Sequence, residues 1–195
     1  MDRDTFWKLI EKCRGPALGR AGRLAWLRGE LARKPAAEIV GFQVCLDRLC
    51  EQGFTWDLWC AAERIFGGWC SDDSFCYFRL WAVGLGSTTF ERAVRNPDTL
   101  AEAPEVHRLV GRPRRSWDDN RPEWEELDYV AAMAHEQVTG VPYDAGSFYE
   151  AVAARRSGDD VLRNPLGERW DVRDELEATR KLPQLSTKFP ITTQP

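Results

Sequence analysis

Residues 56–81 read WDLWCAAERIFGGWCSDDSFCYFRLW, and this stretch decides the fold that we expect for the chain. Apolar residues recur at three- and four-residue spacing across 56–66, which is typical of a helix with one buried face. Thr55 is placed to cap the start of that helix. The Gly-Gly pair at 67–68 is placed to end it, because glycine adopts positive φ without a steric penalty.

A second helix is predicted directly after the Gly-Gly pair. Ser71 or Asp72 can cap it, and Asp72 and Asp73 in its first turn complement the positive end of the helix dipole. Phe75 and Phe78 begin its apolar inner face. The stretch therefore predicts an acidic, thiol-bearing corner between two aromatic helices.

The rest of the chain follows the same helical pattern. We expect further helices over residues 4–13, 20–33, 35–53, 87–96, 98–110, 122–140, 147–156 and 171–180. Asp4 is placed to cap the first of these, and Ser147 with Glu150 fits a capping box. Residues 111–122 lack periodicity and predict an exposed loop, while the tail at 185–195 has no apolar stripe to bury.

These patterns predict an all-α protein, because the alternating apolar and polar residues that indicate strands are scarce. We expect a single-domain multi-helix bundle over residues 1–140. Residues 141–195 are expected to form a less regular C-terminal extension, with one helix followed by an irregular tail.

Several runs resemble a bacterial domain-of-unknown-function family, numbered 4240. The strongest are WDLW, the corner GG-x-CSDD-x-F, and FRLWAVGLG followed by FERAVRNPDTLA. Weaker runs, FWKLIEKC, EIVGFQVCLDRL and DYVAAMAHEQVTG, extend the resemblance over residues 2–140. The resemblance implies a helical bacterial protein and carries no activity, so it supports the fold rather than a function.

Composition narrows the possible functions. With 43% hydrophobic and 30% charged residues the chain is ordinary for a soluble globular protein, and its nine tryptophans favour an aromatic core. The net charge of −4 argues against nucleic acid or an anionic membrane as partner. The charged amino terminus lacks an apolar run of signal or membrane-spanning length, which predicts a cytoplasmic protein.

The six cysteines are expected to stay reduced, and none forms a Cys-x-x-Cys pair, so we expect no structural metal and no cofactor. The corner is the first candidate site. Cys70 precedes a helix amino terminus, which favours a thiolate, but Asp72 and Asp73 oppose that ionisation. The two carboxylates can instead bind a hard cation, especially with Asp57 or Glu63, or simply complement the helix dipole.

Two other groups of residues are candidates. Trp56 and Trp59 share a helix face beside Asp57, which suits either a platform for a planar or cationic ligand or ordinary core packing. His135 and Glu136 open like the zinc-protease helix motif, but Thr139 stands where its second histidine is required. Two alternatives remain for His135: a structural histidine, or an acid–base residue paired with Glu136 or with an aspartate of the corner.

Two functional hypotheses follow from these patterns. The first is a non-enzymatic helical binding or regulatory accessory module, with a protein or a small molecule as its partner. The second is a carboxylate-based enzyme, a hydrolase or tailoring enzyme, whose site is the corner of Asp57, Asp72 and Asp73 with or without a metal. The sequence leaves the choice between enzyme and binding protein open, and also the oligomeric state.

Overall fold

The computed structural model describes residues 1–15, 19–159 and 162–191, and these residues confirm the all-α prediction. The α-helices are α1 (Arg3–Arg14), α2 (Arg20–Leu31), α3 (Ala36–Gln52), α4 (Trp56–Ile65), α5 (Asp72–Gly84), α6 (Ser87–Arg95), α7 (Pro104–His107), α8 (Val130–Thr139), α9 (Ser147–Arg155), α10 (Glu175–Lys181) and α11 (Pro183–Lys188). Short 3-10 helices lie at Pro97–Glu102 (η1), Arg114–Ser116 (η2), Asp118–Asn120 (η3) and Glu125–Leu127 (η4). In the described part of the chain, extended pairing is limited to one bridge between Thr55 and Leu166.

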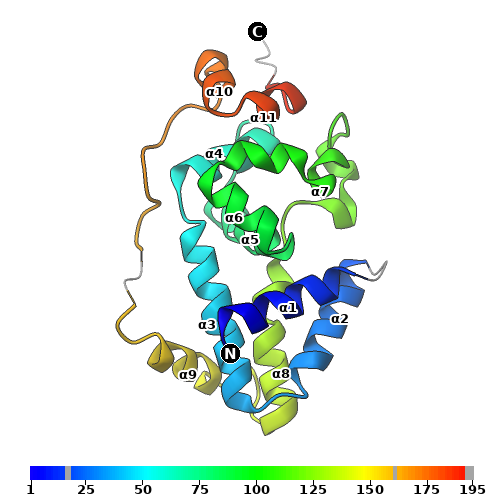
Figure 1. Ribbon diagram of the computed structural model, residues 1–195, viewed down its shortest axis with the longest axis vertical. Coiled ribbons are helices and arrows are strands. Elements are labelled where there is room, and N and C mark those ends of the chain that lie inside the picture. Colours follow the sequence, from blue (N-terminus) through cyan, green and yellow to red (C-terminus); the bar gives the residue numbers. More distant parts are fainter. Residues whose placement is uncertain (16–18, 160–161, 192–195) are drawn as a thin grey trace.

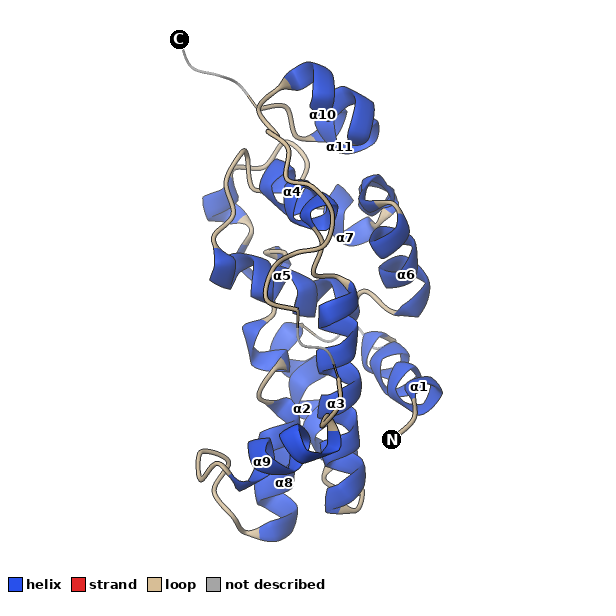
Figure 2. Ribbon diagram, turned by 90° about the vertical axis from the view of Figure 1, so that its left-hand side faces the viewer, coloured by secondary structure: helices blue, strands red, loops and turns tan. Residues whose placement is uncertain are grey.

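The helices form two groups along the long axis of the molecule. Helices α1, α2, α3, α8 and α9 make the lower group in Figure 1, where α8 packs against both α2 and α3. Helices α4 to α7 make the upper group, which α10 and α11 cover from above (Figures 1 and 2). Phe42, Leu46 and Leu49 of α3 are buried, which is what their spacing predicts for the core-facing stripe.

Most tryptophans lie in the core, as the composition predicts. Trp7, Trp59, Trp81, Trp117, Trp124 and Trp170 are buried. Trp26 and Trp56 are half-buried, and Trp69, directly after the Gly-Gly pair, is 62% exposed. Within the described residues, none of the helices combines the length and apolarity that crossing a membrane requires.

The caps of the two central helices are as predicted. Thr55 Oγ1 accepts the amide of Leu58 at 3.2 Å, and Ser71 Oγ accepts the amide of Ser74 at 3.1 Å. Gly67 and Gly68 have φ of 74° and 104°, the left-handed values that stop α4.

Two predicted caps are wrong. The cap of α1 is Asp2, whose Oδ1 accepts the amide of Thr5 at 2.7 Å, and Asp4 lies within the helix. Gly146, with φ of 83°, precedes α9, and Ser147 makes no capping hydrogen bond. In both places the neighbouring residue starts the helix one or two positions earlier than the sequence pattern indicates.

The helix expected from Pro122 begins only at Val130. The amide of Trp124 donates to the carbonyl of Tyr77 on α5 at 3.0 Å, which holds this segment as a 3-10 turn. Trp117, in the loop that was expected to be exposed, is buried. Burial of Trp117 and Trp124 against distant parts of the chain accounts for the packed loop and for the late start of α8.

The prediction of a tail without buried residues is also wrong. Residues 162–174 run along the side of the molecule to α10 and α11 (Figure 1). Leu166 exchanges backbone hydrogen bonds with Phe54 and Trp56, both at 2.9 Å. Leu185 and Phe189 are buried, so the tail packs on the upper helices as far as it is described, while 192–195 lie outside the described residues.

Candidate functional site

The corner between α4 and α5 borders a cavity. The indole Nε1 of Trp59 donates to the carbonyl of Cys70 at 3.2 Å, which joins the end of the Gly-Gly turn to α4. Beside this turn is a cavity of about 360 Å³, lined by Glu63, Gly68, Trp69 and residues 169–173. The cavity therefore lies between the predicted corner and the C-terminal extension.

The two tryptophans at the start of α4 differ in their surroundings, because Trp59 packs in the core and Trp56 faces the extension. Trp59 stacks on Phe75 with ring centroids 4.5 Å apart, and Trp56 stacks on Trp59 at 5.2 Å. The guanidinium carbon of Arg169 lies 5.0 Å from the centroid of the Trp56 ring. Trp59 is thus a core residue, whereas the half-buried Trp56 carries a cation of the chain itself.

Glu63 is the buried carboxylate of this region. It is 5% exposed, and its Oε1 accepts a hydrogen bond from Arg169 Nη2 at 3.2 Å. Burial raises the pKa of Glu63, and the positive charges of Arg169 and Arg173 oppose that rise. Glu63 can therefore receive a positive group or exchange a proton.

Asp57 faces a different cavity from Glu63. Its Oδ1 accepts a hydrogen bond from Trp170 Nε1 at 3.2 Å and lies 3.8 Å from Lys181 Nζ. That cavity, of about 200 Å³, also touches α6, η1 and α10. Asp72 and Asp73 are exposed in the first turn of α5.

Neither metal binding nor a thiolate gains support at the corner. Over residues 1–15, 19–159 and 162–191, His, Cys, Asp and Glu form no group of three or more that could hold a metal ion. Burial raises the pKa of Cys70 to about 12, so its thiol is protonated at neutral pH.

His135 lies between α8 and α9, away from the corner. Its ring is 5.1 Å from the ring of Phe148, and its Nδ1 is 3.5 Å from Thr139 Oγ1. Glu136 beside it is half-buried. These contacts fit the structural alternative for His135, a half-buried ring that packs on a neighbouring helix.

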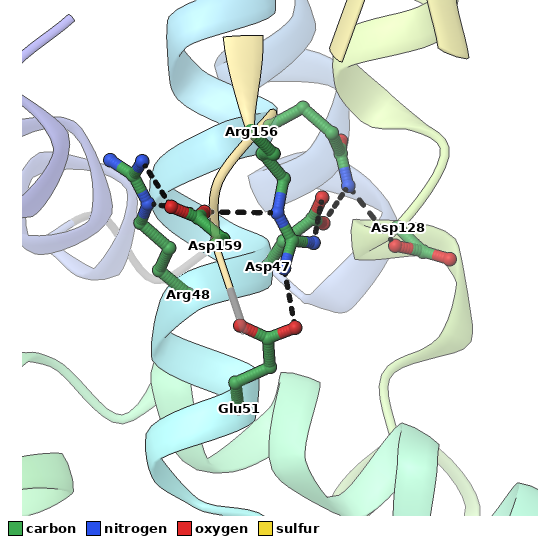
Figure 3. Close-up of polar contacts among 7 residues, drawn as sticks. Asp47, Arg48, Glu51, Asp128, Arg156 and Asp159 are labelled. Carbon is green, nitrogen blue, oxygen red and sulfur yellow. Dashed lines mark hydrogen bonds and ion pairs between the residues drawn. The ribbon is translucent and has the colours of Figure 1, made fainter. Parts of the chain in front are cut away.

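A cluster of charged residues that the sequence analysis did not identify joins the end of α9 to α3 (Figure 3). Arg156 donates to Asp47 at 3.0 Å and to Glu51, and Arg48 makes two 2.9 Å hydrogen bonds to Asp159. Each carboxylate is paired with an arginine of a segment more than 100 positions away in the chain. The cluster therefore fastens the residues that follow α9 to α3.

Gln43 and Asp128 extend this cluster to the end of η4, just before α8. Gln43 Nε2 donates to Asp47 Oδ1 at 2.9 Å and to Asp128 Oδ1 at 3.2 Å. Burial raises the pKa of both aspartates. Ionising Asp47 or Asp128 within the folded protein therefore costs free energy.

A second feature that the sequence did not reveal is an apolar groove between α2 and α8. Its volume is about 400 Å³. It is lined by Leu24, Ala25, Arg28, Glu126, Tyr129, Val130 and Met133. Met133 is 38% exposed, so the groove presents a flexible apolar side chain at the surface.

A family model described as a protein of unknown function (DUF4240) matches residues 1–137. The chain belongs to this family. Comparison with curated proteins and with solved structures gives no match. Both helices of the corner lie within the DUF4240 segment, as does the α2–α8 groove, whereas residues 169–173 of the cavity lie beyond it.

Buried charged residues of the DUF4240 segment have their partners in the extension. Arg64 donates to the carbonyls of Val172 and Ser186 and to the carboxylate of Glu175. Asp98 accepts the backbone amides at the start of α11. The extension is therefore part of the folded core, although it lies outside the family match.

Proposed function

We propose that this DUF4240 protein is a non-enzymatic binding module, an accessory or regulatory protein of the bacterial cytoplasm that binds a protein partner. The observation that carries the proposal is the apolar groove between α2 and α8. Exposed apolar grooves rimmed by polar residues are typical of interaction sites, and adaptable methionines are frequent in them.

The groove has the features that a partner helix requires. Leu24, Val130 and Met133 supply its apolar surface, while Arg28 and Glu126 place one positive and one negative charge at it. An amphipathic helix can lay its apolar face in such a groove and pair its polar flanks with the two charges. We infer a short helical segment of another protein as the partner.

The alternative is a carboxylate-based enzyme at the corner of Asp57, Asp72 and Asp73. Glu63 favours it, because a buried carboxylate with a raised pKa beside a cavity has the property of a proton-transfer residue. Against it, Asp57 is engaged by Trp170 and Lys181 in a different cavity. Turnover of a small molecule that is lost in Asp72→Asn or Asp73→Asn protein of normal stability would support this alternative.

Photo-crosslinking from the groove tests the proposal in cells. A crosslinking amino acid at Ala25 should capture a protein that the same amino acid at Leu176, 87% exposed on α10, does not capture. The captured protein is then purified and its affinity measured. Met133→Asp should weaken the binary complex by at least about tenfold, roughly 1.4 kcal/mol, whereas Leu176→Asp should leave it unchanged.

Two outcomes would refute the proposal. One is a complex whose affinity is the same in the Met133→Asp and Leu176→Asp variants. The other is purified protein that carries a small molecule, converts it, and yields no crosslink from Ala25. Self-association through the groove would appear as a crosslink between two copies of the chain and would replace the foreign partner by a second copy.

A further inference from the structure

Arg169 occupies a position that a bound cation would take. Its guanidinium lies over the ring of Trp56 and donates to Glu63, at the distances given above. The side chain is nevertheless 60% exposed, whereas that of Glu63 is 6% exposed. The carboxylate and the ring are thus fixed by the fold, and the arginine that meets them comes from the surface.

The two groups that receive Arg169 are held rigidly. Trp56 is the outer member of a stack with Trp59 and Phe75, and the indole of Trp59 is hydrogen-bonded to the backbone of Cys70. Glu63 lies two residues before the end of α4. A rigid aromatic face beside a buried carboxylate is the arrangement that recognises guanidinium and ammonium groups.

The space for the rest of a ligand lies next to Arg169. The 360 Å³ cavity is lined by both Arg169 and Glu63, and its size falls within the range of small-molecule sites. Trp69, the exposed tryptophan, stands at this cavity and offers a second aromatic surface. Arg173 and Asp171 line it as well, one positive and one negative.

We propose that Glu63 and the ring of Trp56 form a binding site for the guanidinium or ammonium group of a small ligand, and that Arg169 occupies this site in the free protein. The ligand displaces Arg169 into solvent and places its remaining atoms in the cavity beside Trp69. The site is separate from the α2–α8 groove, so the test of this proposal does not depend on the protein partner proposed above.

Displacement predicts a definite effect of removing Arg169. A ligand must displace Arg169, so the affinity of the wild type is reduced by the fraction of molecules in which the site is free. With Arg169 in the site about 90% of the time, Arg169→Ala should bind a cationic ligand about tenfold more tightly than the wild type. Glu63→Gln keeps the size of the side chain but removes its charge, and combined with Arg169→Ala it should abolish that binding. Arg180→Ala, an exposed arginine of α10 paired with Glu177, is the matched control and should behave as the wild type.

The experiment is a titration of the full chain with agmatine, followed by the NMR signals of the arginine Nε–H groups and of the tryptophan indoles. In the wild type, the Nε signal of Arg169 should move to the position of a solvated arginine while the indole signal of Trp56 shifts. A ligand elsewhere in the cavity would leave the Arg169 signal in place, which would overturn the proposal.

Two further results would also overturn it. One is folded Arg169→Ala protein that shows no saturable binding of agmatine up to about 10 mM. That concentration is above the effective concentration at which Arg169 itself fills the site in the wild type. The other is equal binding with and without Glu63→Gln. If Arg169→Ala does not fold, Arg169→Gln, which retains most of the aliphatic stem, is titrated in its place and judged by the same criteria.

Discussion

Replacing Arg64 by alanine should release the C-terminal extension from α4. The Arg64 side chain is 0% exposed. It donates to the carbonyls of Val172 at 3.0 Å and Ser186 at 3.3 Å, and makes two 2.8 Å hydrogen bonds to Glu175. Alanine at this position leaves two buried carbonyl groups without a donor.

The structure sets the size of the effect. A hydrogen bond from a charged donor to a buried carbonyl contributes about 1.5 kcal/mol, and Arg64 makes two of these, to Val172 and Ser186. Glu175 is half exposed, so solvent screens its ion pair with Arg64, which contributes about 1 kcal/mol at most. Arg64→Ala should therefore lower the free energy of unfolding by about 4 kcal/mol.

Urea denaturation followed by tryptophan fluorescence measures this loss, with Glu175→Gln as the control. The control removes only the screened ion pair and should cost less than about 1 kcal/mol. Hydrogen exchange should show that amides of α10 and α11 lose protection in Arg64→Ala, while those of α3 and α8 keep theirs. A loss below about 1 kcal/mol, or one equal to that of Glu175→Gln, would refute the reasoning.

Three further predictions follow from single contacts. Asp98→Ala removes the buried carboxylate that accepts two amides of α11 and should cost about 2 kcal/mol in urea denaturation; a cost near zero would contradict that role. Burial raises the pKa of Asp128, so its stabilising contribution is present below the unfolded pKa and is lost as pH rises through the folded pKa. Asp128→Asn, which can still accept from Gln43, should be more stable than the wild type at pH 7 and equal to it near pH 3, and the reverse order would contradict this sign. Ser71→Ala should cost about 1 kcal/mol through loss of the cap, against about 0.3 kcal/mol for Asp72→Ala, in thermal or urea unfolding; equal costs would place the cap elsewhere.

The helices of the corner were predictable because their signals are local. The apolar spacing of α4, the Thr55 and Ser71 caps and the Gly-Gly stop all lie within one or two turns of the backbone they act on. The start of α8 was not predictable in this way. Its delay depends on a hydrogen bond from Trp124 to Tyr77, 47 positions earlier in the sequence, and no periodicity encodes that contact.

The candidate site, too, was predictable from the sequence only where its signals are local. Glu63 and Trp56 were recognisable as candidates because they share a helix with the corner and have the chemistry of a binding site. Their partner Arg169 lies 106 positions from Glu63, in a segment whose sequence has no regular pattern. The cavity depends on how that segment crosses α4, which is a matter of packing and not of local preference.

The extension therefore determines what the DUF4240 segment can present to a ligand. Helix α4 directs Asp57, Glu63 and Arg64 at residues 169–175, so in this chain each of the three side chains already has a partner within the molecule. The three contacts differ in exposure: Arg64 is fully buried, whereas Arg169 on Glu63 is mostly exposed. Since a buried contact holds the extension and an exposed one can open at small cost, Arg64 is the anchor of the fold and Arg169 is the contact that a ligand can replace.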